Sequence, residues 1–203
     1  MYRIFYNHES VGDVLMIVFN NLVTPNKVVK DDNVTSLYKD DELIGINIFE
    51  ISKIMKIHFN GMLVAPNKEF IKIINYILEN HHLPKLEIIE SGFRVGKILT
   101  CEEHPDSDHL HVTTVDVKDQ ILDIVCGAPN CKEGEKVVVA MPGTIMFDGS
   151  VIVPSSLRGV KSNGMMCSAR ELHLPNAPQV RGLLILDDTY NVGDDFFKEE
   201  IGE

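Results

Sequence analysis

The chain has 203 residues, which suits one large domain or two small ones. Hydrophobic residues make up 44% and charged residues 24%, as in globular proteins, and no run of 18 apolar residues is present, which excludes a transmembrane helix. The formal net charge of −11 excludes a general polycation, so any contact with nucleic acid requires a local basic site.

The beginning of the chain and its cysteines indicate the compartment. The sequence MYRIFYNHESVGDV lacks the basic and apolar regions of a secretory signal, so we expect a cytoplasmic protein without membrane contact. Four cysteines are too few for a disulfide framework at this length, and their spacing is not that of a zinc finger. We interpret all of them as buried or inert thiols: Cys101, Cys126, Cys131 and Cys167.

Residues 1–90 are predicted to form a small α/β domain. A helix is expected after Asn67, which can serve as its N-cap, because apolar residues from Phe70 to Leu78 follow helical spacing and Pro84 comes after its end. We expect its apolar face to pack on the sheet of the same domain, and a homodimer interface is the alternative. Short apolar runs predict the strands Tyr2–Tyr6, Val14–Phe19, Lys27–Val29, Thr35–Lys39 and Leu43–Phe49.

Residues 91–203 are predicted to form a second, all-β domain after a linker at 85–92 that ends in Ser91-Gly92. Many short strands with close turns favour a small barrel, and the count suits a five-stranded OB-fold. A change in the apolar pattern predicts a bulge near Thr113-Thr114. The expected strands are 93–100, 110–117, 121–126, 136–141, 151–153, the two arms of a hairpin around Asn163, and 183–186. The predicted fold class is therefore a two-domain α+β protein.

The segment Leu157–Arg170, LRGVKSNGMMCSAR, is the most informative stretch of the chain. Its Asn163-Gly164 dipeptide predicts the turn of a β-hairpin, because both residues tolerate positive φ. From Ser155 to Gly182 the only acid is Glu171, and the cations are Arg158, Lys161, Arg170 and Arg181. A local charge of +3 in an acidic protein suggests an anionic polymer as partner, whereas the simpler interpretation is a solvated hairpin with ordinary surface charges.

The loop CEEHPDSDHLH, residues 101–111, offers a metal site as an alternative. His104, Asp106, Asp108 and His109 have a spacing similar to that of metallo-β-lactamase-type hydrolases, with one His replaced by Asp, and His173 could add a ligand. A metal-dependent hydrolase that uses His104, Asp108 and His109 is therefore the competing function. The bland interpretation is a turn whose Asp side chains bond backbone amides. No P-loop, Rossmann fingerprint or G-x-S-x-G motif indicates a cofactor or another enzyme.

Residues 93 to about 197 resemble a known tRNA-binding OB domain. The matching stretches are VGKIL, HPDSDHLHV, DIVCGAPNCKEGEKVVVA, SLRGVKSNGMMCSARELHL and GLLILDD. The domain occurs in the bacterial phenylalanyl-tRNA synthetase β subunit, in the EMAP-II family and in methionyl-tRNA synthetase appendages. With its extra N-terminal domain, the chain is similar to the YtpR family of bacterial tRNA-binding proteins. The resemblance implies tRNA as partner, no catalytic activity and an accessory role for residues 1–90.

The resemblance also assigns residues of this chain to the binding site. In the family's HPxADKL loop the usual Lys is His109 here, and Asp106 and Asp108 are expected to hold the loop shape, which argues against the metal site. Arg158 and Lys161 are expected to approach phosphates, although Arg158 could equally be tied to a carboxylate such as that of Asp108. The full predicted RNA-binding set is Lys97, His109, Arg158, Lys161, Ser162, Asn163, Ser168 and Arg170.

Aromatic residues are scarce in the second half of the chain. They are Phe93, Phe147, Tyr190, Phe196 and Phe197. Single-strand binders of the OB type stack bases on aromatic rings, whereas folded RNA is recognised mostly through its phosphates, hydroxyls and shape. The sequence therefore favours recognition of folded tRNA over general single-strand binding.

Overall fold

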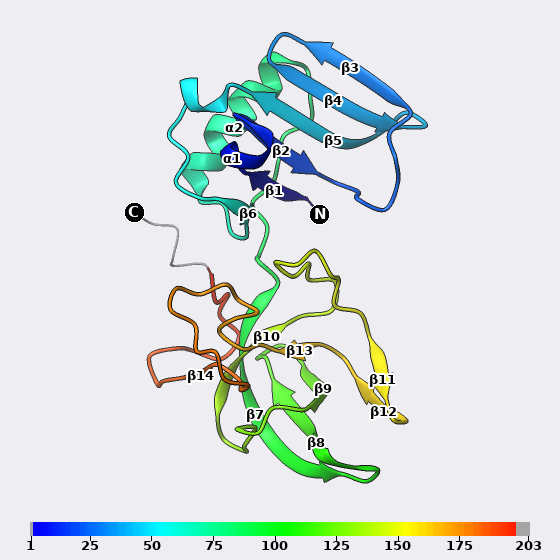
Figure 1. The fold of residues 1–203 in the computed structure, drawn as a ribbon, viewed down its shortest axis with the longest axis vertical. Coiled ribbons are helices and arrows are strands. Elements are labelled where there is room, and N and C mark those ends of the chain that lie inside the picture. The colour runs from blue at the N-terminus through cyan, green and yellow to red at the C-terminus, as the bar shows by residue number, and fades with distance from the viewer. Residues whose placement is uncertain (1, 198–203) are drawn as a thin grey trace. The chain divides into compact units, whose positions relative to one another are not determined.

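The structure is a computed structural model that describes residues 2–197. Within this range the chain divides into two compact units, the first ending at Ile89 and the second beginning at Glu90 (Figure 1). Residues 198–203 of the predicted second domain lie outside the described residues. No helix in the described part of the chain is long and apolar enough to cross a membrane.

The N-terminal unit is built on one six-stranded sheet with strand order β3-β4-β5-β2-β1-β6. Every strand pair in it is antiparallel. The sequence predicted a small α/β domain without strand directions, and the structure has an antiparallel sheet accompanied by helices. The strands are β1 (Arg3–Tyr6), β2 (Val14–Val18), β3 (Lys27–Asp31), β4 (Val34–Lys39), β5 (Glu42–Phe49) and β6 (Gly61–Leu63), with a short helix α1 (His8–Val11) and a 3₁₀ turn η1 (Ile51–Lys53).

Helix α2 (Lys68–Asn80) confirms the predicted helix and its cap. The Asn67 side chain accepts a hydrogen bond from the backbone N–H of Phe70 at 2.8 Å, as expected of an N-cap. At the other end His82 has a φ of 55°, and Leu83 N donates to Leu78 O at 2.9 Å, which forms a Schellman motif before Pro84. The helix ends are therefore determined by local sequence.

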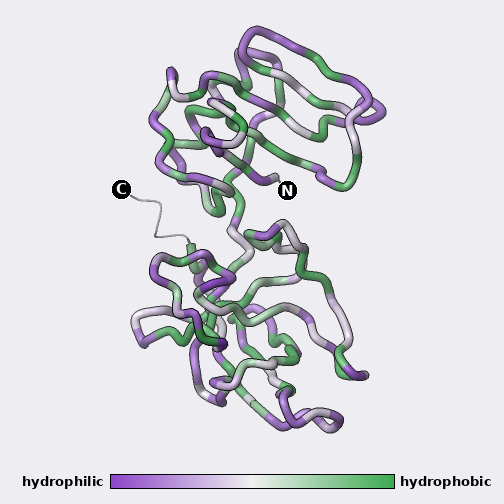
Figure 2. The backbone as a smooth tube through the Cα atoms, in the orientation of Figure 1, coloured by the Kyte–Doolittle hydropathy of each residue, from purple (hydrophilic) through white to green (hydrophobic). Residues whose placement is uncertain are grey.

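The apolar face of α2 packs within its own unit. Ile74 and Leu78 are fully buried, and the ring of Phe70 contacts that of Phe59, which in turn contacts Tyr6 of β1. Figure 2 shows the same contrast along the tube, with hydrophobic colour on the central strands and hydrophilic colour on many connecting turns. This burial agrees with packing of the helix on its own sheet.

The C-terminal unit is a closed β-barrel of OB-like topology. Its main sheet has the order β13-β10-β7-β8-β9, and β14 pairs with β10. The free edge of β9 meets the segment before β13, because Val125 N donates to Ser162 Oγ at 3.1 Å and Asn163 N donates to Asp123 O at 2.7 Å. The strands are β7 (Phe93–His104), β8 (Ser107–Asp116), β9 (Ile121–Cys126), β10 (Lys136–Ala140), β11 (Ser155–Leu157), β12 (Val160–Ser162), β13 (Met165–Met166) and β14 (Ile185–Leu186).

The long strand β7 pairs with β10 on one side and with β8 on the other, and it contains the bulge. Its register changes between Ile98 and Thr100, so Leu99 is the extra residue opposite Val115 and Thr114. The irregularity predicted near Thr113-Thr114 is therefore present, but the extra residue lies on the partner strand. The strand predicted at 151–153 is reduced to a single bridge between Ile145 and Val151.

The predicted linker at 85–92 is ordered on both sides of the boundary between the units. Leu86 exchanges two hydrogen bonds with the Asn75 side chain in the N-terminal unit. Ser91 is 1% exposed and bonds both carboxylate oxygens of Asp195, through its backbone N at 2.6 Å and its hydroxyl at 2.5 Å. The Ser91-Gly92 pair is therefore part of the barrel's core and not a loose connection.

Truncation of the helix face gives a direct test of the N-terminal core. Ile74→Ala should lower the free energy of unfolding by about 2–5 kcal/mol, because it removes a fully buried side chain and leaves a cavity. Tyr76 lies on the same helix and is 68% exposed, so Tyr76→Ala should change the free energy of unfolding by no more than about 0.5 kcal/mol. Denaturant titration of the two variants measures the difference, and equal losses would contradict the packing of α2.

Candidate nucleic-acid interface

The hairpin that carries the predicted phosphate contacts turns at Arg158-Gly159. Strands β11 and β12 pair from Ser155↔Ser162 to Leu157↔Val160, which leaves two residues in the loop. Arg158 has a φ of 46° and Gly159 a φ of 84°, and two positive values are what a type I′ turn requires. The turn predicted at Asn163-Gly164 is therefore wrong.

Gly164 has a different task from the one predicted. It has a φ of 127°, and a Cβ placed on it would lie 3.1 Å from the carbonyl oxygen of Ala140. The glycine thus permits a close approach to β10 as the chain passes from β12 to β13. A close tertiary contact, which the local sequence does not show, therefore accounts for the glycine at position 164.

A buried histidine anchors this hairpin to the β7–β8 turn. His104 is 4% exposed; its Nδ1 accepts a hydrogen bond from Asp106 N at 3.1 Å, and its Nε2 lies 3.2 Å from Leu157 O. Because Nδ1 is the acceptor, the ring proton resides on Nε2 and is donated to Leu157. One neutral imidazole therefore joins the turn at the end of β7 to the tip of the hairpin.

Arg158 adds a second contact at the same junction. Its Nη1 donates to the backbone carbonyl of Asp106 at 2.5 Å. The alternative partner considered for it, Asp108, instead lies 3.3 Å from Nε2 of His109, and both side chains are more than 80% exposed. The single bond to Asp106 leaves most of the five guanidinium donors of Arg158 directed to solvent.

The metal site is not supported by this geometry. Both ring nitrogens of His104 are engaged with backbone groups, so the residue has no free donor for a metal. His173 stacks on Phe147, with ring centroids 4.7 Å apart, and does not join His109. Within residues 2–197 no group of three His, Cys, Asp or Glu side chains is placed to hold a metal ion.

Two predicted polar contacts have structural tasks. Ser162, which the sequence assigned to hydrogen bonding with RNA, is 4% exposed, and its hydroxyl accepts the N–H of Val125, so it closes the barrel. The Ser168 hydroxyl donates to Glu171 Oε2 at 2.6 Å, and the Ser168 N–H donates to the same oxygen at 2.7 Å. This Ser-x-x-Glu arrangement is that of a capping box, and it orders the turn that carries Arg170.

The cations of the segment 155–182 have no acidic partner in the described chain, unlike Arg94 and Lys136 of the same unit. Arg94 pairs with Glu90 and Asp119, and Lys136 pairs with Asp188. In the described chain no carboxylate lies within ion-pair distance of the exposed cations Arg158, Lys161, Arg170 and Arg181. These four cations, which we call the unpaired cations, provide uncompensated positive charge in an acidic protein.

Lys97 is set apart from the hairpin. It lies on β7 opposite Asp116 and Lys136, seven residues before His104. At about 3.3 Å per residue, this separation is about 20 Å along the strand. The structure therefore places Lys97 away from the Arg158 turn, whereas exposed His109 lies on β8 three residues after Asp106, whose carbonyl accepts the hydrogen bond of Arg158.

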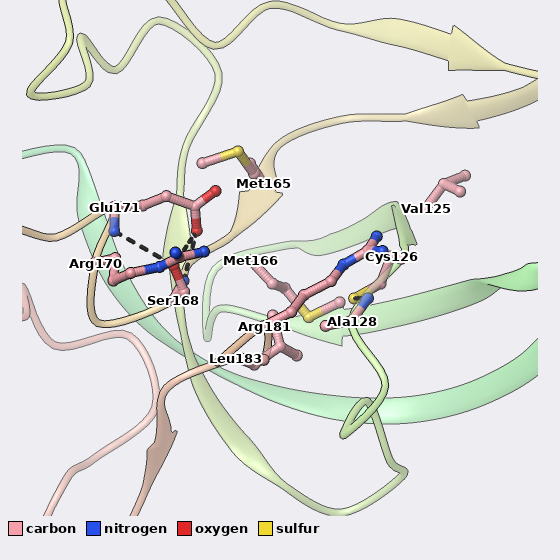
Figure 3. Close-up of a pocket in the computed structure, with 12 residues that line it drawn as sticks. Val125, Cys126, Ala128, Met165, Met166, Ser168, Arg170, Glu171, Arg181 and Leu183 are labelled. Carbon is pink, nitrogen blue, oxygen red and sulfur yellow. Dashed lines mark hydrogen bonds between the residues drawn. The ribbon is translucent and has the colours of Figure 1, made fainter. Parts of the chain in front are cut away.

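A pocket of about 370 Å³ opens beside Arg170 and Arg181 (Figure 3). The guanidinium of Arg181 lies over Gly127, where a Cβ would come within 2.7 Å of Nη2. Arg181 was counted in the basic segment but was not assigned to the predicted site, because only the folded chain brings it to the end of β9. The other lining residues are Val125, Cys126, Ala128, Met165, Met166, Ser168, Glu171, Gly182 and Leu183.

Cys126 lines this pocket and interacts with Cys131, which does not line it. Sγ of Cys101 lies 3.6 Å from Sγ of Cys131, and Cys126 Sγ accepts the N–H of Ala128 at 3.4 Å. A hydrogen bond from Cys131 lowers the pKa of the Cys126 thiol, and the positive charge of Arg181 adds to this effect. The same interaction and burial raise the pKa of Cys131. Cys126, Cys131 and Cys167 are buried, as predicted, whereas Cys101 is half-buried.

Comparisons with known proteins match a family model to each unit. Residues 93–195 match a family model described as "Putative tRNA binding domain", and residues 23–86 match a domain of unknown function, DUF4479. The phenylalanine–tRNA ligase β subunit of Porphyromonas gingivalis is 46% identical over 123 residues, which cover 57% of this chain and 15% of that subunit. A crystal structure of the C-terminal domain of Plasmodium vivax p43 matches 50% of this chain and 56% of its own, with 28% identity and a TM-score of 0.37.

One relative spans both units. The Bacillus subtilis protein named "Putative tRNA-binding protein YtpR" is 41% identical over 198 residues, which cover 95% of this chain and 98% of that protein. The closed barrel and the matched family model define the class, a protein with a tRNA-binding-type OB-like domain. The chain belongs to the YtpR family of bacterial proteins.

Removal of the His104 side-chain bonds tests the anchor of the hairpin. His104→Phe keeps a ring of similar size but leaves Asp106 N and Leu157 O without their partner. Two lost hydrogen bonds should lower the free energy of unfolding by about 1–3 kcal/mol and speed hydrogen exchange at the Asp106 amide. The 83% exposed His109 gives the control, since His109→Phe should change neither quantity. Unchanged exchange at Asp106 in His104→Phe would contradict the anchor.

Proposed function

We propose that this protein binds tRNA non-catalytically, through the OB-like barrel of its C-terminal unit. The observation that carries the proposal is the set of unpaired cations, Arg158, Lys161, Arg170 and Arg181. In a chain of formal net charge −11, exposed cations without acidic partners attract an anion. A polyanion with regularly spaced phosphates can meet several of them at once.

The scarcity of accessible aromatic rings in the C-terminal unit favours recognition of folded RNA over general binding of single strands. Phe93, Phe196 and Phe197 are buried, so these rings are not available to stack against bases. Phe147 is covered on one face by His173, and Tyr190 is stacked on Phe196. A C-terminal unit with so few free rings depends on phosphate and hydroxyl contacts, which are the main contacts to A-form RNA.

The names of the relatives support tRNA as the folded RNA. The Bacillus subtilis protein is named for tRNA binding, and the matching ligase subunit belongs to an enzyme whose name includes tRNA. The proposal assigns binding to the unit that begins near residue 90 and an accessory role to residues 1–90. Because tRNA is its ligand, the proposal places the protein in the cytoplasm.

Neutralisation of the hairpin cations tests this function. If Arg158 and Lys161 each contact one phosphate, Arg158→Gln/Lys161→Gln should weaken tRNA binding. The slope of log K against log salt should then become shallower by about 1.4–1.8, or about 0.7–0.9 per phosphate. Fluorescence titrations of bulk tRNA at several salt concentrations measure this slope.

A charge-matched variant controls for the general loss of positive charge. Lys56→Gln/Lys118→Gln removes two exposed lysines that have no ion-pair partner within residues 2–197 and lie outside the hairpin. Its salt slope should stay near that of the unchanged protein. Equal slopes in both double variants would mean that the hairpin cations do not contact phosphate.

A further inference from the structure

The pocket beside Arg170 and Arg181 has the dimensions and chemistry of a site for one nucleotide. It is bounded by the end of β9, by β13 and by the segment 181–183, and its volume is about 370 Å³. Ligand pockets in proteins typically have volumes of about 300–1,000 Å³. The space is therefore too small for a duplex but sufficient for a single base with its sugar.

The two guanidinium groups are available to an anion. Both side chains are exposed, and neither has a carboxylate within ion-pair distance in the described chain. In Figure 3 Met166 lies between the two arginine side chains in this view. Guanidinium groups bind phosphate oxygens in a two-pronged manner and also stack on bases.

Part of the lining is apolar and polarisable, and its accessible portion belongs chiefly to Met165, because Met166, Ala128 and Leu183 are buried. Met165, Met166, Ala128 and Leu183 contribute aliphatic and thioether groups, and the buried Cys126 contributes a thiol. Thioether sulfur makes favourable contacts with aromatic rings, and a methionine side chain adapts to their shape. This surface suits the face of a nucleobase and offers nothing to a bare inorganic anion.

Glu171 is positioned to read the edge of a base without neutralising the arginines. Its Oε2 already accepts two hydrogen bonds from Ser168, which fix the carboxylate at the wall of the pocket. The other oxygen, Oε1, is left to accept a hydrogen bond from a base N–H. A carboxylate, two guanidinium groups and an apolar surface together match the parts of a nucleotide.

We propose that this pocket takes one unpaired nucleotide of the bound RNA, with its phosphate on Arg170 and Arg181 and its base against Met165 and Met166. The proposal rests on the proposed function and adds to it a requirement for an unstacked base. A base inside a duplex cannot enter, because its edge is paired and both of its faces are stacked. A bulged or looped nucleotide can enter at little cost.

The test compares two RNA duplexes of equal nucleotide number. One carries a single unpaired 2-aminopurine bulge, and the other is fully paired apart from the same nucleotide as a stacked terminal overhang. The full-length protein should bind the bulged duplex about two- to twelvefold more tightly, which is the range for one thioether contact with an aromatic ring. The fluorescence of the 2-aminopurine should also change when the bulged base enters the pocket.

The pocket variant is Arg170→Gln/Arg181→Gln, and the matched control is again Lys56→Gln/Lys118→Gln. The pocket variant should bind both duplexes with equal affinity and leave the 2-aminopurine signal unchanged, whereas the control should keep the preference. Arg170 and Arg181 are exposed, so a circular dichroism spectrum like that of the unchanged protein is expected for both variants.

The possible failures are distinguishable. Equal binding of the two duplexes by the unchanged protein, or a preference that survives in Arg170→Gln/Arg181→Gln, would overturn the nucleotide pocket while the binding of tRNA stands. Failure of the unchanged protein to bind either duplex or bulk tRNA would overturn the proposed function together with the pocket.

Discussion

The proposed binding surface depends on one buried imidazole. His104 closes the turn after β7 through Asp106 and fixes the tip of the β11–β12 hairpin through Leu157. A two-stranded hairpin alone is marginally stable, so the direction in which Arg158 and Lys161 point depends on this anchor and on the bond from Ser162 to β9. The groups that shape the surface are thus buried, and the groups that carry its charge are exposed.

The excess of acid makes the arrangement of charge informative. Several cations in both units have an acidic partner nearby, as in the pairs Lys27–Asp41, Lys85–Glu79 and Arg94–Asp119. Exposed ion pairs contribute little to stability, so their absence around the hairpin costs the fold almost nothing. Leaving those cations unpaired does, however, preserve their field for a ligand. An acidic protein can therefore bind a polyanion through the local positive charge around the hairpin, although its net charge is negative.

Local signals in the sequence predicted the local structure well, and tertiary constraints account for the differences. The Asn67 cap and the spacing from Phe70 to Leu78 define a helix without reference to the remainder of the chain. Asn163-Gly164 carried a strong turn signal, yet Gly164 serves a close approach to Ala140, and the hairpin turns at Arg158-Gly159. Antiparallel pairing in the N-terminal sheet depends on strand direction, which apolar periodicity does not record.

The same distinction applies to the candidate site. The basic segment could be read directly from the residues, and the family resemblance assigned His109 to the site. Barrel closure, however, buries Ser162 and brings Arg181 over Gly127, more than 50 residues away in sequence. The pocket is formed by these long-range contacts, so spacing in the sequence could not reveal it.

The measurement that tests the account most directly is a nuclear magnetic resonance titration of the full-length protein with tRNA. We predict that perturbed amide and arginine side-chain signals concentrate at residues 104–110, 155–171 and 181–183. Perturbations confined to the N-terminal unit or to the strand around Lys97, with those three segments unchanged, would contradict the account.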